Sequence, residues 1–85
     1  MRVSKKNISS RNRGNDSIRN QIRRLRFDNG EMTQQQLADK AQVTRQTIIA
    51  LEQGRYCPSL LLAFRIAKAF DVGVEDVFVY EAEKT

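Results

Sequence analysis

The chain has 85 residues, which fits one domain. A chain of this length buries only about 60% or slightly more of its unfolded surface, so a deep enzymatic cleft is hard to build. It has no histidine and one cysteine, which removes the usual general base, the commonest metal ligand and any internal disulfide. No apolar run approaches the roughly 20 residues of a membrane span. We therefore expect a cytoplasmic protein that is not an enzyme, binds no cofactor or metal and does not enter a membrane.

The net charge of +5 is unevenly distributed. Residues 1–26 carry nine Lys or Arg and one acid, whereas residues 27–85 carry six basic and nine acidic residues. A basic segment on a small body favours a polyanionic partner, most often nucleic acid. Residues 1–16 are polar and show no helical or strand period, so we interpret them as a flexible basic arm. A merely solubilising tail is the alternative, and charge alone does not choose between the two.

The first predicted helix follows this arm. Ile18, Ile22 and Leu25 recur at i, i+4 and i+7, which is one face of a helix. Asn29-Gly30 is a strong stop signal. We expect a helix from about Ile18 to this stop.

Two short helices occupy the centre of the chain. Thr33, with Gln36 three residues later, predicts a capping box at the start of the first, and Leu37, Ala38 and Ala41 give it an apolar side. After a break at Gln42-Val43, Thr44 caps a second helix that ends at Gly54 and turns Ile48 and Leu51 inward. Two helices joined by so short a break predict a helix-turn-helix.

A longer apolar helix follows over 60–70, with Ser59 as its N-cap. Its predicted inner stripe consists of Leu60, Ala63, Phe64, Ala67 and Phe70.

The end of the chain combines helical and strand signals. Glu75-Asp76 favour the first turn of a last short helix, because acids suit the positive N-terminal dipole. Val77-Phe78-Val79-Tyr80 is β-branched and aromatic, which suits a short strand paired either with residues near Ile18 or with another subunit. The predicted fold is thus all-α, with five helices in a domain over 17–80, a possible strand pair, and a tail over 81–85.

The outer side of the second central helix has chemistry suited to a DNA groove. Arginine makes a bidentate contact with guanine, glutamine with adenine, and threonine or isoleucine can contact a thymine methyl. An ordinary polar helix surface is the alternative. The residues predicted to face bases are Arg45, Gln46, Thr47, Ile49 and Ala50.

Residues 20–80 resemble the Xre-type, lambda-repressor/Cro-like helix-turn-helix family. The resemblance rests on several spaced motifs, which are Ile22-Arg23-Arg24-Leu25-Arg26, Thr33-Gln34, Leu37-Ala38, Val43-Thr44-Arg45-Gln46-Thr47-Ile48, Leu51-Glu52-Gln53-Gly54, Pro58-Ser59-Leu60, Ile66-Ala67 and Val74-Glu75-Asp76-Val77-Phe78. It is strongest to short stand-alone members, some of which are dimeric repressors with a small antiparallel strand pair. The resemblance implies a five-helix fold that binds double-stranded DNA.

The resemblance also implies residue roles. Arg26 and Glu52 match a partly buried ion pair between helices, although Arg26 could alternatively face DNA. The family usually has glycine where this chain has Gln42. A non-glycine residue at positive φ is uncommon, so we expect the turn to be slightly altered. The residues that the resemblance implies contact the DNA backbone are Gln34, Thr44, Gln53 and Arg55.

The leading functional hypothesis is a dimeric repressor, because one helix-turn-helix contacts only half of a site and a second copy on a pseudo-palindrome supplies the other half. The alternative is a protein-interaction adaptor or antitoxin-like partner that uses the same fold. The sequence identifies no operator and no small-molecule effector.

Overall fold

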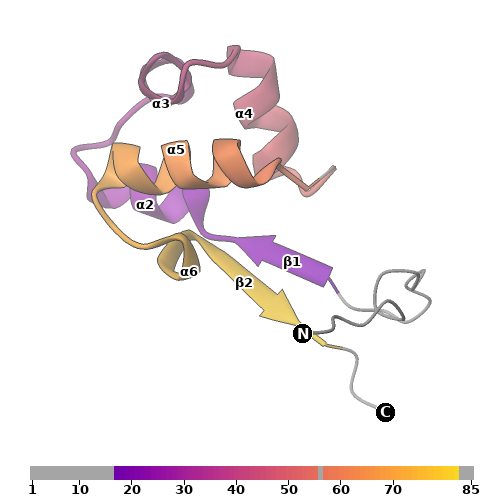
Figure 1. Ribbon diagram of the computed structural model, residues 1–85. Helices are drawn as coiled ribbons and strands as arrows, with labels where there is room; N and C mark the ends of the chain where they lie inside the picture. The colour runs from indigo at the N-terminus through magenta and orange to yellow at the C-terminus, as the bar shows by residue number, and fades with distance from the viewer. Residues whose placement is uncertain (1–16, 56, 83–85) are drawn as a thin grey trace.

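The computed structural model describes residues 17–55 and 57–82. This part of the chain contains five helices and a two-stranded antiparallel sheet, as the sequence predicts (Figure 1). The predicted arm over 1–16 and most of the predicted tail over 81–85 lie outside the described residues. In chain order the elements are β1 Ser17–Asn20, α2 Ile22–Asp28, α3 Gln34–Ala41, α4 Arg45–Glu52, α5 Leu60–Phe70, α6 Val74–Val77 and β2 Phe78–Glu81.

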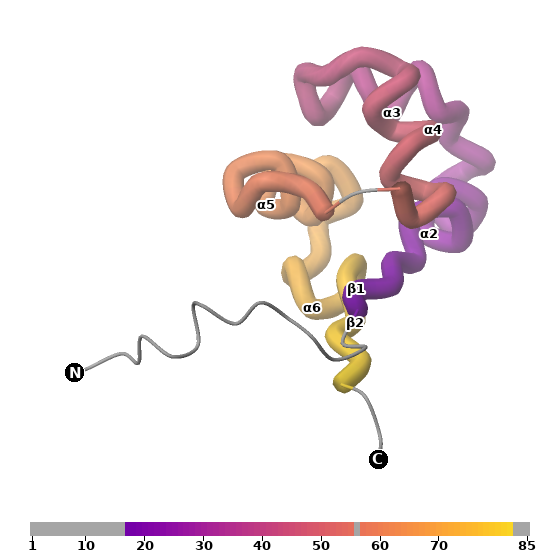
Figure 2. The backbone as a smooth tube through the Cα atoms, turned by 90° about the vertical axis from the view of Figure 1, so that its right-hand side faces the viewer, coloured from indigo at the N-terminus to yellow at the C-terminus, as the bar shows by residue number. Residues whose placement is uncertain are grey.

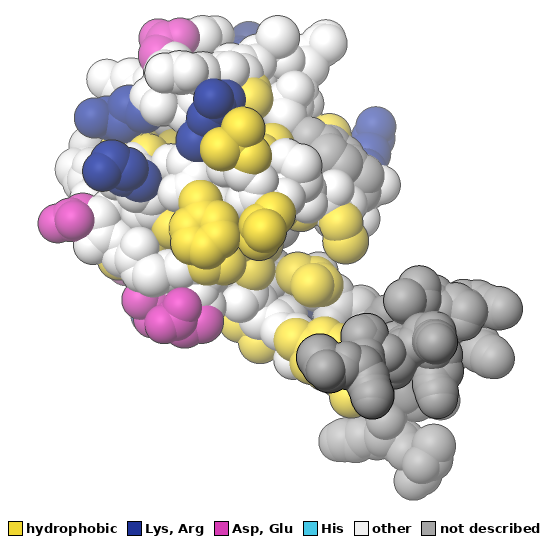
Figure 3. All heavy atoms as spheres, viewed as in Figure 1, with side chains coloured by type: hydrophobic (Ala, Val, Ile, Leu, Met, Phe, Trp, Pro, Cys, Tyr) yellow, Lys and Arg dark blue, Asp and Glu magenta, His cyan; other side chains and the backbone are white. Residues whose placement is uncertain are grey.

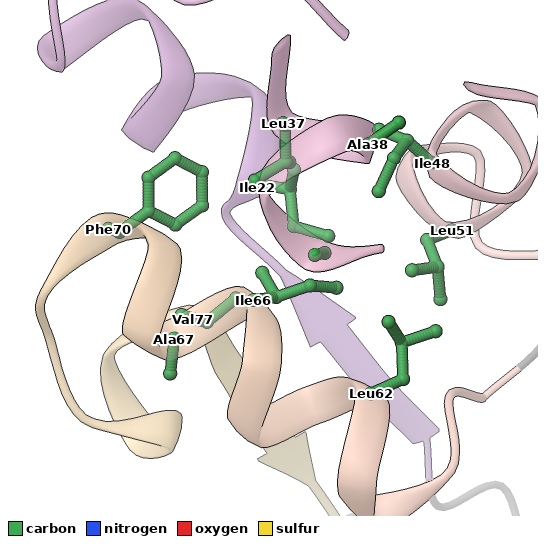
Figure 4. Close-up of a cluster of buried hydrophobic side chains, with 11 residues drawn as sticks. Ile22, Leu37, Ala38, Ile48, Leu51, Leu62, Ile66, Ala67, Phe70 and Val77 are labelled. Carbon is green, nitrogen blue, oxygen red and sulfur yellow. The ribbon is translucent and has the colours of Figure 1, made fainter. Parts of the chain in front are cut away.

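The core lies where the five helices meet, and α5 packs against α3 and α6. In Figure 4, Ala38 of α3 and Ile48 of α4 lie on facing helices, and neither side chain is exposed. A small residue at this crossing lets the two helices approach closely. The largest fully buried side chains are Ile22, Leu37, Ile48, Leu51, Ile66 and Val77.

Polar caps begin three of the helices, at the three positions predicted from sequence. Thr33 accepts a hydrogen bond from the backbone N–H of Gln36 at 2.9 Å, and the Gln36 side chain accepts one in return from the N–H of Thr33 at 2.8 Å. Thr44 and Ser59 cap α4 and α5 in the same way, without the reciprocal bond. These caps satisfy N–H groups that a helix start otherwise leaves unpaired.

The two strands pair in register, with Ile18 opposite Tyr80 and Asn20 opposite Phe78. The predicted helix from Ile18 is therefore wrong, because this residue belongs to β1 and α2 starts only at Ile22. The reason lies in two hydrogen bonds: the backbone N–H of Gln21 donates to the carbonyl of Val77 at 2.8 Å, and the side chain of Asn20 accepts from the N–H of Ile22 at 3.1 Å. Of the two strand partners considered for the C-terminal segment, the one within the same chain is present.

The inner side of α5 also differs from the prediction. Ala63, Ala67 and Phe70 are buried as expected, but Leu60 and Phe64 are 73% and 57% exposed. Leu62 and Ile66 complete the buried side in their place. The sequence of α5 has apolar residues on nearly every side, so periodicity alone could not select the face that packs.

Candidate nucleic-acid interface

The turn between α3 and α4 fixes the orientation of the second helix. Gln42 adopts the left-handed conformation, with φ 63° and ψ 43°. The N–H of Val43 then donates to the carbonyl of Ala38 at 3.0 Å, which closes the end of α3. Gln42 thus adopts the left-handed conformation that usually favours glycine, in place of the altered turn expected from the sequence, at a cost of about 1 kcal/mol.

The start of α4 is held by its threonine cap. The hydroxyl of Thr44 accepts from the N–H of Thr47 at 3.2 Å, and the two hydroxyl oxygens are 3.0 Å apart. Arg45 and Gln46 follow on the first turn and are exposed. Their side chains can therefore reach a ligand without displacing core residues.

An open groove runs along the outer side of α4. It brings together most residues that the sequence assigned to DNA contact, both base-facing and backbone-facing. Arg45 is exposed at the helix start but outside this groove, and Gln34 lines a different one. The groove is lined by Thr44, Gln46, Thr47, Ile49, Ala50, Gln53 and Arg55.

A hydrogen-bonded network connects α4 to α2 and α3. The guanidinium of Arg26 binds the carboxylate of Glu52 through two bonds, from Nε at 2.7 Å and from Nη2 at 3.1 Å. Its Nη1 donates to the carbonyl of Met32 at 2.9 Å. The side chains of Arg26 and Glu52 are only 15% and 10% exposed. The pair expected from the resemblance is thus a bidentate, largely buried bond between α2 and α4, so Arg26 does not face outward.

Gln34 joins the same network. Its side-chain Nε2 donates to Oε1 of Glu52 at 3.2 Å, a contact that the sequence did not predict. A primary amide has two N–H donors, so this bond leaves one donor for another partner. Glu52 therefore both neutralises Arg26 and orients the amide expected to bind a phosphate.

A second groove lies between α2 and α4. Arg23 and Phe27 of α2 line it together with Ile49 of α4 and Gln53, the C-cap of α4. The Arg26–Glu52 pair lines it as well. Neither Arg23 nor Phe27 is among the site residues predicted from sequence. Their spacing of four residues, on a side of α2 away from buried Ile22, is the signal that could have found them.

Two kinds of feature are absent from the part of the chain that the structure describes. No cluster of three or more His, Cys, Asp or Glu side chains suitable for a metal ion is found among them. Among the same residues, no helix has the length and apolar character needed to cross a membrane.

The comparison with protein families agrees with this geometry. A family model described as helix-turn-helix matches residues 22–77. This range begins with α2 and ends with α6, and it includes both central helices and their turn.

Relatives occur in archaea and in a bacterium. An uncharacterized HTH-type transcriptional regulator of Methanocaldococcus jannaschii is 58% identical over 62% of this chain and 80% of its own length. One from Methanothermobacter thermautotrophicus is 51% identical over 78% of this chain and 96% of its own. The uncharacterized HTH-type transcriptional regulator YgzD of Bacillus subtilis is 47% identical over 78% of this chain and 98% of its own. The chain belongs to the Xre/Cro-like helix-turn-helix family of DNA-binding transcriptional regulators, a family of regulators and not of enzymes.

Proposed function

We propose that this protein is a cytoplasmic homodimeric repressor that binds a pseudo-palindromic DNA site and inserts α4 into the major groove. The observation that carries the proposal is the open outer side of α4, where hydrogen-bonding and methyl-bearing side chains follow a capped helix start. An α-helix fits the major groove, and each base pair there presents a distinct pattern of donors and acceptors. One such helix contacts few base pairs, so the proposal includes a second copy.

The proposed base contacts divide by chemistry. Arg45 and Gln46 are exposed on the first turn, and their side chains suit guanine and adenine respectively. Thr47, Ile49 and Ala50 are half-buried and present methyl groups, which suit thymine methyls or sugars.

The proposed backbone contacts surround these residues. Gln34 has a second amide donor directed by Glu52, and Arg55 follows the end of α4 with an exposed guanidinium. Thr44 and Gln53 line the groove at the two ends of α4. Such contacts set the position of α4 on the duplex and carry no sequence information.

Selection of bound sequences from a random DNA pool tests the proposal. We expect a two-fold symmetric site whose half-site centres are about 10 bp apart, one turn of the duplex. Enrichment of a single unsymmetric half-site would contradict the dimer, and no enrichment would contradict sequence-specific binding.

Repression is the simplest consequence of such binding, because occupying a promoter needs no surface beyond the DNA interface. A reporter gene placed behind the selected site should lose expression when the protein is supplied. A reporter whose expression rises would make the protein an activator.

An adaptor or antitoxin-like partner is the second candidate, and one observation favours it. Residues 27–85 carry nine acidic and six basic residues, which opposes approach to DNA. Affinity measured against salt separates the two candidates: each phosphate contact contributes about −0.9 to the slope of log K against log salt. An adaptor would show no salt-dependent binding to DNA.

The basic segment 1–16 offers a sharper form of this test. It carries five Lys or Arg and one acid, whereas residues 27–85 are net acidic. Deleting residues 2–14 should weaken DNA binding and flatten the salt slope by several units per dimer, at about 0.9 per lost phosphate contact. Thermal melts should show equal stability of the two forms. An unchanged slope would exclude a role for the segment in binding.

A further inference from the structure

A second groove flanks α4 on the side away from Arg55. Ile49 and Gln53 line both grooves beside α4, so these two residues lie between them. Arg55 lines one groove, whereas Arg23, Phe27 and Gln34 line the other, which we call the α2–α4 groove. Figure 2 shows α2, α3 and α4 together on the side of the molecule away from α5.

The guanidinium of Arg23 is the feature of this groove that indicates a ligand. Its neighbour Arg24 lies 3.7 Å from the carboxylate of Asp28, and Arg26 is bound by Glu52. Within the part of the chain that the structure describes, Arg23 is thus the arginine of α2 without a hydrogen bond or ion pair, and it is exposed. A guanidinium has five N–H donors in a geometry that matches phosphate.

The other polar residues of the groove include a second donor and one opposing charge. The amide of Gln34 gives one N–H to Glu52 at 3.2 Å and keeps the other. The carboxylate of Glu52 is itself neutralised by Arg26. Glu31, which has no ion pair within the described residues, is the lining charge that opposes an anion. Recognition of an anion here therefore depends on Arg23 and Gln34 acting together.

The width of a helix explains why both flanks of α4 would meet DNA. An α-helix with its side chains is about 10–12 Å across, and the major groove is about 12 Å wide, so the phosphates of the two strands lie on either side of an inserted helix. The start of α5 offers no alternative donors. Figure 3 shows hydrophobic side chains gathered over α5, where Leu60, Leu61 and Phe64 are exposed.

We propose that the α2–α4 groove binds the sugar-phosphate backbone of one DNA strand, with Arg23 and Gln34 on phosphates and Phe27 packed against a deoxyribose. Phe27 follows Arg23 by four residues, so it shares its side of α2, and it is 66% exposed. The inference rests on the proposed function for the insertion of α4 into the major groove. Contacts to phosphate and sugar carry no base information, so Arg23 positions α4 and does not read sequence.

Affinity measured against salt tests the groove. The full chain is compared with Arg23→Gln on the selected site and on DNA of unrelated sequence. Arg23→Gln should flatten the slope of log K against log salt by about 0.9 per half-site, and equally on both DNAs. Arg24→Gln is the matched control, because it removes the same charge from the next residue of α2, where Asp28 already pairs with it. This control should leave the slope nearly unchanged.

Two further measurements locate the contact. Ethylation of one phosphate in each half-site should block binding of wild type and of Arg24→Gln, whereas Arg23→Gln should bind equally well with or without that modification. Glu31→Gln has the opposite sign, because it removes the charge that opposes phosphate, and it should tighten binding to both DNAs.

The outcomes separate the groove from the proposed function. Equal slopes and equal ethylation patterns for Arg23→Gln and Arg24→Gln, or a Glu31→Gln variant that binds no tighter, would overturn the groove and leave specific binding by wild type intact. A slope flattened by Arg23→Gln alone, in a protein that enriches no sequence from a DNA pool, would support the groove and contradict base reading by α4. A wild type that binds neither DNA would overturn both.

Discussion

The two helices α4 and α5 are both amphipathic toward the core, yet their outer sides differ completely. On α4, Ile48 and Leu51 are buried, and the exposed first turn carries Arg45 and Gln46. On α5 the first turns expose leucine and phenylalanine. Hydrogen-bonding side chains suit the edges of bases, whereas apolar side chains suit a protein surface. From this comparison we propose that α4, and not α5, is the helix that contacts DNA.

The two regions also differ in how they are fixed. Neighbouring residues build the helix-turn-helix through the caps and through the turn at Gln42. The strand pair joins residues about 60 positions apart, and one exposed ion pair, between Arg19 and Glu81 at 2.8 Å, adds to it. The helix-turn-helix is held by local hydrogen bonds and a largely buried ion pair, whereas the strand pair is held by backbone hydrogen bonds between segments far apart in the sequence.

The largest difference should appear between the two ion pairs. Glu52→Gln removes the charge that balances Arg26 in a largely buried site, so the free energy of unfolding should fall by up to about 3–5 kcal/mol. Glu81→Gln removes the partner of Arg19, whose side chain is 67% exposed, and should cost about 0–1 kcal/mol. Urea melts of both variants measure this. Equal losses would mean that the Arg26–Glu52 pair is not buried in solution.

A second difference separates two adjacent leucines of α5. Leu62 is 9% exposed and packs in the core, so Leu62→Ala should cost about 2–5 kcal/mol. Leu61 is 59% exposed, so Leu61→Ala should change stability by about 0.5 kcal/mol or less in the monomer. The melts are made at a concentration where sedimentation shows monomer. A larger loss for Leu61→Ala would mean that the buried side of α5 is assigned wrongly.

The smallest effect concerns the turn. Gln42→Gly relieves the left-handed backbone and should stabilise the protein by up to about 1 kcal/mol. Gln35→Gly, an exposed position within α3, should instead destabilise it by about 1 kcal/mol. Opposite signs in thermal melts are the expected result. A loss of stability in both variants would contradict the positive φ at Gln42.

Local sequence signals predicted the helix starts and the turn of the helix-turn-helix better than they predicted the strand pair. Thr33, Thr44 and Ser59 each mark a helix start through contacts within three residues, and Gln42 marks the turn. Such contacts depend on sequence spacing alone, so the pattern sufficed to find them.

The wrong predictions concern residues whose structure depends on contacts with residues far away in the sequence. Ile18 fits a helical period with its neighbours, but pairing with Tyr80 places it in a strand. Leu60 and Phe64 fit one stripe of α5, but packing against α3 selects the side with Leu62 and Ile66. The bond from Gln34 to Glu52 joins residues 18 positions apart and needs the turn geometry to form. The sequence alone contains no local signal for these contacts.

The proposed function requires that α4 reads base sequence and that the residues around it bind the DNA backbone. The most direct test measures the affinity of wild type, Arg45→Ala, Gln46→Ala and Gln34→Ala for the selected site and for every single-base variant of it. We expect Arg45→Ala and Gln46→Ala each to cost about 1–3 kcal/mol on the best site and to lose the preference at one base position per half-site. Gln34→Ala should weaken binding to all the sequences nearly evenly. Full retention of base preference by both Arg45→Ala and Gln46→Ala would contradict the assignment of α4 as the recognition helix.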